Sequence, residues 1–176
     1  MLLPRSSSAM FGLLACLVSA GVSPGDRRVV DVVEVGNAIS EAKHGYESHD
    51  VLAGVASGKS FRQARGWMHY GLATFDDTEV TIACTFVRTD SGGVIEPRRF
   101  DIVVEDSVLA TRTVTIPSIT PVVVEITVPF AITKGKTHIS VIIRANGGPT
   151  PALRELRTIQ DHYELDPLLN PFGVAR

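Results

Sequence analysis

Hydrophobic and polar residues alternate along much of the chain after residue 28, with the period of two that is typical of β-strands. In the segment 79–87, Val80, Ile82, Cys84 and Phe86 fall on one face, and smaller or polar residues fall on the other. Alternation and β-branched runs, separated by turn residues, together predict eight strands. These are residues 29–35, 67–75, 79–87, 100–104, 108–116, 122–128, 138–145 and 152–159.

The strand pattern predicts an all-β fold, an antiparallel β-sandwich or jelly roll of about eight strands. No long amphipathic helix interrupts the pattern, and only the segment 131–136 is expected to form a short helical turn. Because residues 37–60 are polar, rich in glycine and serine and without a sustained period, we expect a long loop with short ordered pieces there.

The N-terminus carries the features of a secretory signal peptide. One positive residue, Arg5, precedes an apolar run that ends in the small residues Val18 and Ala20, so cleavage is expected after Ala20. The run is too short to cross a membrane comfortably. A buried N-terminal helix is the alternative interpretation, and lipid attachment at Cys16 ranks below plain secretion. We therefore expect a secreted or periplasmic protein without a membrane span.

The predicted signal peptide and the strand pattern divide the chain into four parts. They are a signal peptide (1–20), a linker (21–28), a β-sandwich domain (29–163) and a C-terminal tail (164–176).

Composition excludes some classes of protein. The chain has 17 lysines and arginines against 19 acidic residues, a net charge of −2, which argues against a nucleic-acid-binding protein. A hydrophobic fraction of 44% argues against disorder. Cleavage after Ala20 would leave a single cysteine, Cys84, which its strand pattern predicts to be a small buried hydrophobe.

Motifs for catalysis and for cofactors are missing from the sequence. It contains no helical His-Glu-x-x-His pair, no cysteine pair for zinc, no Gly-x-Ser-x-Gly elbow and no phosphate-binding loop. Glu41 and His44 lie three residues apart in the expected loop, but ordinary polar loop residues are the simpler interpretation. We therefore predict no cofactor and no metal site.

The segment around Trp67 has the ingredients of a sugar-binding surface, because an exposed aromatic ring can stack on a sugar while polar groups fix its hydroxyls. Trp67 is the only tryptophan, with Tyr70 and Arg62 nearby in the sequence. In a strand, Trp67 and His69 point to one side and Met68 and Tyr70 to the other. The alternative is that Trp67 is a core residue of the sandwich.

Several short motifs follow one another along the chain. They are Val30-Asp31-Val32-Val33 with Gly36, Glu41 and His44; Phe61-Arg62-Gln63-Ala64; Gly66-Trp67-Met68-His69-Tyr70; Arg99-Phe100-Asp101-Ile102-Val103-Val104; Val128-Pro129; Thr133-Lys134-Gly135-Lys136; and Leu156-Arg157-Thr158-Ile159. In this order they resemble the β-sandwich domain that follows the catalytic barrel in bacterial β-L-arabinofuranosidases of glycoside hydrolase families 127 and 146. Phe61 stands where that family has tryptophan, and the chain has no counterpart of the catalytic barrel.

The resemblance implies an exported, noncatalytic carbohydrate-binding domain whose partner is an arabinose-containing polysaccharide or a separate glycosidase. The candidate contact residues are Trp67, Tyr70, Arg62, His44 and Glu41. Trp67 or Tyr70 would stack on the sugar, Arg62 would bind hydroxyls or pair with a carboxylate, and Glu41 would accept hydroxyl protons. The alternative is a protein-interaction module that docks on a separate glycosidase or an envelope protein, marked by a broad apolar patch.

Overall fold

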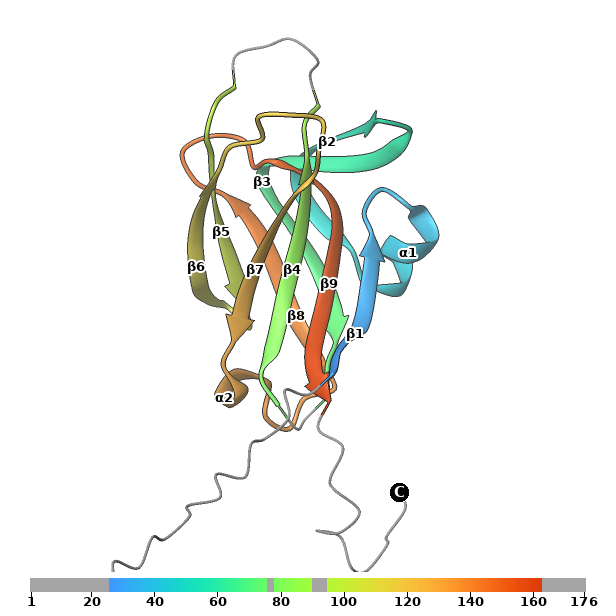
Figure 1. The fold of residues 1–176 in the computed structure, drawn as a ribbon, viewed down its shortest axis with the longest axis vertical. Coiled ribbons are helices and arrows are strands. Elements are labelled where there is room, and N and C mark those ends of the chain that lie inside the picture. The colour runs from blue at the N-terminus through green and yellow to red at the C-terminus, as the bar shows by residue number, and fades with distance from the viewer. Residues whose placement is uncertain (1–25, 76–77, 90–94, 163–176) are drawn as a thin grey trace, which may run out of the picture.

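The computed structural model describes residues 26–75, 78–89 and 95–162, and in this part of the chain it has nine strands and two short helices (Figure 1). The strands are β1 (Asp26–Glu34), β2 (Glu47–Ala56), β3 (Lys59–Ala73), β4 (Val80–Val87), β5 (Arg98–Val104), β6 (Ser107–Val114), β7 (Val122–Val128), β8 (His138–Ala145) and β9 (Ala152–His162). The helices are α1 (Ala38–Lys43) and α2 (Phe130–Thr133). The expected signal peptide with Cys16, and the expected tail 164–176, lie outside the described residues.

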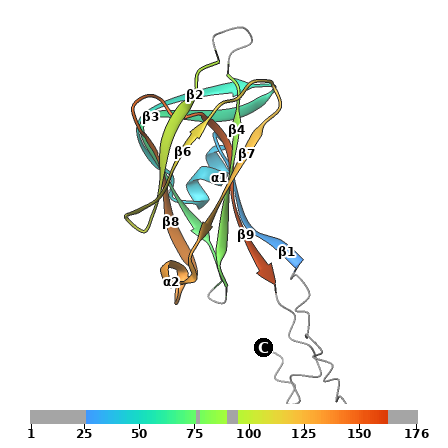
Figure 2. The same ribbon diagram turned by 60° about the vertical axis from the view of Figure 1, so that its left-hand side comes forward.

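All strand pairings are antiparallel. The strand order is β6-β5-β8-β3-β9-β4-β7, with β1 added beside β9 and β2 beside β3. Strands β3 and β9 pair at a single register position, Arg62 opposite Leu153. There the path passes from one layer of strands to the other, and Figure 2 shows the two layers facing each other. The predicted all-β, antiparallel sandwich is confirmed.

The core lies between the two layers. Phe86 of β4 and Phe100 of β5 meet there with ring centroids 5.0 Å apart and their planes at 64°. The side chains of Val80, Ile82 and Cys84 are also fully buried, as their alternation predicts. Burial raises the pKa of the Cys84 thiol to about 12, so this cysteine is an inert core residue.

Residues 37–60 were expected to form a long loop with short ordered pieces, but most of this stretch is regular structure, the helix α1 and the ten-residue strand β2. Helix α1 begins where the side chain of Asn37 accepts hydrogen bonds from the amides of Ile39 and Ser40. Strand β2 is an edge strand that pairs with β3 alone in the described sheet. Its residues are mostly exposed on both faces, so it lacks the alternation that marks a half-buried strand.

Strand β3 begins eight residues earlier than predicted, and its first part forms a hairpin with β2. Phe61 anchors this hairpin, because it is buried with Val87 and Ala152 at one end of the sandwich. Its ring covers Gly54, where any side chain would overlap it. Strand β1 also starts inside the expected linker 21–28, at Asp26. No helix in the described ranges is long and apolar enough to cross a membrane.

Candidate functional site

Trp67 lies in the middle of β3 and points away from the core. Its side chain is half-buried, whereas Met68 and Tyr70 are fully buried. This is the predicted division of the strand into two faces. Trp67 therefore presents part of its indole ring on the outer face of the sheet.

Five strands contribute to a row of side-chain positions across this outer face. In register order, the row consists of His49 on β2, Trp67 on β3, Arg144 on β8, Asp101 on β5 and Thr111 on β6. We call these five residues the Trp67 row. Residues in register on neighbouring antiparallel strands have their Cβ atoms about 5 Å apart on the same face. A ligand lying across the strands could therefore contact several of them.

A β-bulge sets the position of Trp67. The β2–β3 register shifts between His49 and Val51, so that Arg65 and Gly66 stand beside the single residue Asp50. Bulges turn the local direction of side chains and often occur beside functional sites. A side chain at Gly66 would overlap the backbone carbonyl of His49. Glycine thus allows His49 to approach β3 next to Trp67.

Hydrogen bonds fix the polar side chains around Trp67. One nitrogen of His69 lies 3.0 Å from the Ser140 hydroxyl, and the other lies 3.3 Å from the Gly45 carbonyl oxygen. Arg144 donates to a carboxylate oxygen of Asp101 at 3.0 Å. These contacts hold the polar groups in place before any ligand arrives, which lowers the entropic cost of binding.

Asp101 organises one end of the Trp67 row. Its carboxylate also accepts hydrogen bonds from Thr111 at 2.7 Å and from the Asn146 amide at 2.8 Å. Burial by itself raises the pKa of Asp101, but the hydrogen bonds from Asn146, Thr111 and Arg144 outweigh this, and the pKa lies below its ordinary value.

This carboxylate gives a pH-dependent contribution to stability. In the unfolded chain Asp101 takes up a proton near its ordinary pKa of about 3.9, whereas in the folded protein it does so only at lower pH. Its contribution is therefore present above about pH 4 and is lost as the pH falls through the lower, folded-state pKa. We expect Asp101→Asn to be less stable than the wild type at pH 7, and the difference to shrink below pH 4. Urea midpoints at pH 7, 4 and 3 measure this, and a difference that stays constant would contradict it.

Glu41 and Arg62, two of the candidate contact residues, bind each other. Arg62 makes two hydrogen bonds of 2.6 Å to the two carboxylate oxygens of Glu41, which is a buried residue of the first turn of α1. The amide of Gly36 donates to the same carboxylate at 2.8 Å. This is the carboxylate pairing that was one of the two predicted roles for Arg62. Because the ion pair occupies both carboxylate oxygens, we assign Glu41 and Arg62 a structural role and not a role in binding a ligand.

Tyr70, the second candidate platform, lies beneath this pair. Its ring is completely buried, and its centroid lies 5.1 Å from the centroid of the Tyr46 ring. The guanidinium carbon of Arg62 lies 4.6 Å from the same Tyr46 centroid. Burial and the nearby Glu41 carboxylate raise the pKa of Tyr70. Tyr70, predicted as the alternative to Trp67 for stacking, therefore has no surface on which a sugar could stack.

His44 ends α1 and is also buried. Its Nδ1 lies 2.6 Å from the Ser40 carbonyl oxygen, and its Nε2 lies 3.1 Å from Asp31. Asp31 also accepts a hydrogen bond of 2.9 Å from the amide of Ala73 on β3. Both contacts of the imidazole are hydrogen bonds only when both nitrogens carry a proton. His44 therefore links α1 to β1 and β3. Of the five candidates, only Trp67 remains accessible as a stacking surface.

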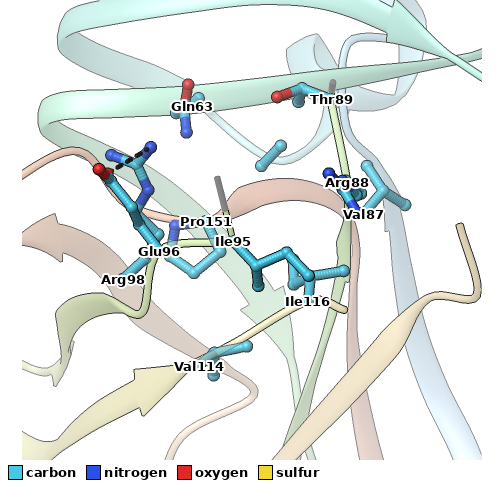
Figure 3. A pocket seen from close by; sticks show the side chains of 11 residues that line it. Gln63, Val87, Arg88, Thr89, Ile95, Glu96, Arg98, Val114, Ile116 and Pro151 are labelled. Atoms are coloured by element: carbon cyan, nitrogen blue, oxygen red, sulfur yellow. Dashed lines mark ion pairs between the residues drawn. The ribbon is translucent and has the colours of Figure 1, made fainter. Parts of the chain in front are cut away.

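A second surface feature, which the sequence analysis missed, is a hollow at the end of the sandwich where the β4–β5, β6–β7 and β8–β9 connections meet (Figure 3). Apolar side chains and polar side chains both line it. The lining includes Ile95, Ile116, Pro151, Gln63, Glu96 and Arg98. No local sequence pattern marks these residues, because the fold brings them together from five segments.

The described residues contain no cluster of three or more histidine, cysteine, aspartate or glutamate side chains that could hold a metal ion.

Comparisons with known proteins identify a family and a fold. A family model described as "Family of unknown function (DUF6805)" matches residues 26–159. A search of curated protein sequences found no match.

Solved structures resemble the fold. A family 35 carbohydrate binding module from Clostridium thermocellum has a TM-score of 0.53 and 5% identity, and the match covers 76% of this chain and 97% of that module. A second family 35 module, from an environmental isolate, has a TM-score of 0.53 and 17% identity, and the match covers 77% of this chain and 99% of that module. The ANXUR1 extracellular domain from Arabidopsis thaliana has a TM-score of 0.56 and 8% identity, and the match covers 78% of this chain and 49% of that domain. At these identities the likeness is one of fold alone.

Proposed function

The chain belongs to DUF6805, a family of unknown function, and we propose that its β-sandwich is a noncatalytic carbohydrate-binding domain. The observation that carries the proposal is the position of Trp67, partly exposed on the outer face of the sheet and in register between His49 and Arg144. An aromatic ring beside fixed hydrogen-bonding groups is the arrangement that binds sugars. The fold match to two family 35 modules, which extends over nearly their whole length, supports it.

In this proposal a glycan lies across the Trp67 row. One sugar ring stacks on the indole of Trp67, because the C–H face of a sugar is apolar. Arg144, held by Asp101, donates hydrogen bonds to hydroxyls or ring oxygens on one side. His49, exposed on β2, does so on the other side. Since the surface is shallow and buries few ligand atoms, the affinity for a short oligosaccharide will be modest.

We further propose a ligand class and a location for the domain. The sequence resemblance to the sandwich domain of β-L-arabinofuranosidases supports a role as an accessory domain that binds an arabinose-containing polysaccharide or a separate glycosidase. Arabinose-containing polysaccharides are therefore the first ligands to test. The signal-like N-terminal segment supports export to the compartment where such polymers occur.

The test compares the wild type with Trp67→Ala in binding to arabinan, arabinogalactan and arabinoxylan by affinity electrophoresis and calorimetry. Loss of a stacking contact worth about 1.5 kcal/mol weakens binding about tenfold. Phe75→Ala is the matched control, because Phe75 is another exposed aromatic residue, two positions beyond the end of β3, with 57% of its surface accessible.

We expect the control to bind like the wild type. Equal binding by Trp67→Ala and the wild type would remove Trp67 from the site. If the wild type retains no glycan at all, the carbohydrate proposal fails, and the protein-docking alternative takes its place.

A further inference from the structure

We propose that the chain forms a symmetric dimer, in which the free edge of β2 pairs with the same strand of a second copy. Strand β2 lies at the outside of its layer (Figure 1), and among the described strands it pairs with β3 alone. Its other edge therefore presents backbone N–H and C=O groups that no described strand binds. Such an edge can pair with a strand of another chain. The inference concerns assembly and does not depend on carbohydrate binding.

The other three edge strands of the described sheet carry features that oppose such pairing. Charged residues and bulges are the usual protection of a sheet edge. Strand β1 has Arg27 and Arg28 and a register shift in its pairing with β9. Strand β6 has Arg112 and a register shift in its pairing with β5, and β7 has Glu125 at its centre. The second half of β2, residues 51–56, has no charged residue and no proline. It is the unprotected edge of the described sheet.

The sequence of this segment is complementary to itself on one face. Val51, Ala53 and Val55 alternate along the strand and share a face. An antiparallel pairing centred on Ala53 places Val51 of each copy opposite Val55 of the other. Val55 is 69% exposed in the single chain, and pairs of β-branched residues stabilise neighbouring strands. The symmetry of this face about Ala53 points to a second copy as the occupant of the edge.

The opposite face fits the same register. There Leu52 of each copy faces Gly54 of the other, and Gly54 has no side chain to oppose it. The ring of Phe61 lies over Gly54 within each chain. Leu52, which is 62% exposed, therefore packs against the Phe61 ring of the second copy. A large and a small residue thus meet at each of the two equivalent positions.

The ends of the paired segment are compatible in charge. Asp50 of one copy comes opposite Ala56 of the other, whose neighbour on β3 is Lys59. Asp50 and Lys59 are both exposed, so unlike charges approach each other at both ends. Because each chain has one such edge, pairing it with its own copy closes the assembly as a dimer. The contact is small for a protein interface, so we expect the dimer to dissociate on dilution.

The dimer has a consequence that does rest on the proposed function. The two-fold axis stands perpendicular to the joined sheet, so the outer faces of both copies lie on the same side. The Trp67 rows of both chains then face the same way. A polysaccharide long enough to reach both rows would bind the dimer more tightly than the monomer, because the second contact is intramolecular.

Disulfide cross-linking tests the register. Ala53→Cys places two sulfurs at the two-fold axis, where the Cα atoms of opposed residues are about 4.5–5.5 Å apart, a distance that a disulfide spans. Val55→Cys is the matched control, since position 55 is also exposed but lies roughly 13 Å along the strand from its own counterpart. Both variants carry Cys16→Ser, and the remaining Cys84 is buried. With oxidised glutathione we expect Ala53→Cys to form a covalent dimer about tenfold faster than Val55→Cys, because pairing raises the effective concentration of the thiols.

Sedimentation velocity of the full chain over a range of concentrations tests the dimer itself. We expect the mass of the wild type to rise with concentration towards that of two chains. Val55→Lys places a charge on the edge and should raise the dissociation constant of the dimer about tenfold or more. Val123→Lys is the matched control, because Val123 is a 55% exposed valine on the edge strand β7. We expect it to dimerise like the wild type.

Three results would overturn the inference. A wild type that stays monomeric at every concentration leaves the β2 edge to a different partner or to none. A dimer that Val55→Lys and Val123→Lys affect equally uses another surface. Equal rates of cross-linking for Ala53→Cys and Val55→Cys show that the strands do not pair about Ala53. No glycan enters these measurements, so their failure leaves the proposed function untouched, and failure of glycan binding leaves the dimer untouched.

Discussion

Replacing Glu41 with alanine is expected to lower the free energy of unfolding by about 3 kcal/mol, because it breaks a buried ion pair. The carboxylate is 5% exposed and its partner Arg62 is 23% exposed. Removing Glu41 leaves the guanidinium of Arg62 over the Tyr46 ring without its counter-charge, and the Gly36 amide without its acceptor. Because Arg62 keeps some contact with water, the effect belongs at the lower end of the range for buried pairs.

Urea unfolding of Glu41→Ala, Arg62→Ala and the double variant measures the coupling between the two residues. We expect the double variant to lose much less than the sum of the single losses, because it leaves no isolated buried charge. Glu125→Ala is the control, since the exposed Arg27–Glu125 pair should contribute less than about 1 kcal/mol. A loss in Glu41→Ala as small as that of the control would contradict the scaffold role of the pair.

Gly66→Ala is expected to cost about 2 kcal/mol and to change the environment of Trp67. The added methyl group would overlap the carbonyl of His49 and lie 3.0 Å from a ring carbon of its imidazole. The backbone of β2 has to move away to make room, and the bulge that positions Trp67 moves with it. Urea unfolding measures the change in stability. The emission maximum of the single tryptophan reports the change in the environment of Trp67.

Gly71→Ala provides the matched control on the same strand. A methyl group there would meet the His44 carbonyl oxygen at 3.5 Å, an ordinary van der Waals distance. We expect this variant to be as stable as the wild type or slightly more stable, because alanine loses less backbone entropy than glycine on folding. Equal stability of Gly66→Ala and Gly71→Ala would show that the close approach of His49 to Gly66 has no energetic importance.

Much of the fold could be predicted from the sequence, because most strands bury one face against the core. The β-branched run in β7 belongs to a strand whose burial alternates in this way. In β4 the alternation marks the fully buried residues correctly, although the other face of that strand is largely covered too. Strand β2 could not be found in this way. It is an edge strand with both faces largely exposed, and its pairing with β3 is a contact between backbones that leaves no period in the side chains.

The candidate site was predictable only in part. Alternation in β3 correctly separates Trp67 from Tyr70, since that follows from the strand period alone. The pairing of Glu41 with Arg62 depends on a helix, α1, that the sequence analysis did not predict. Arg144 and Asp101 join Trp67 only through the register of β3, β8 and β5. Register between strands distant in sequence is set by the assembled core, so local patterns do not reveal this row.

Fluorescence shows whether the indole of Trp67 is an accessible sugar-binding surface, because the chain has one tryptophan. Emission of residues 21–176 would be recorded with arabinose-containing oligosaccharides and with acrylamide as quencher. We expect an emission that acrylamide quenches, and a saturable shift with the oligosaccharide that protects the indole from the quencher. A blue emission that resists acrylamide and does not change with any of these sugars would place Trp67 in the core and rule out sugar binding at its ring.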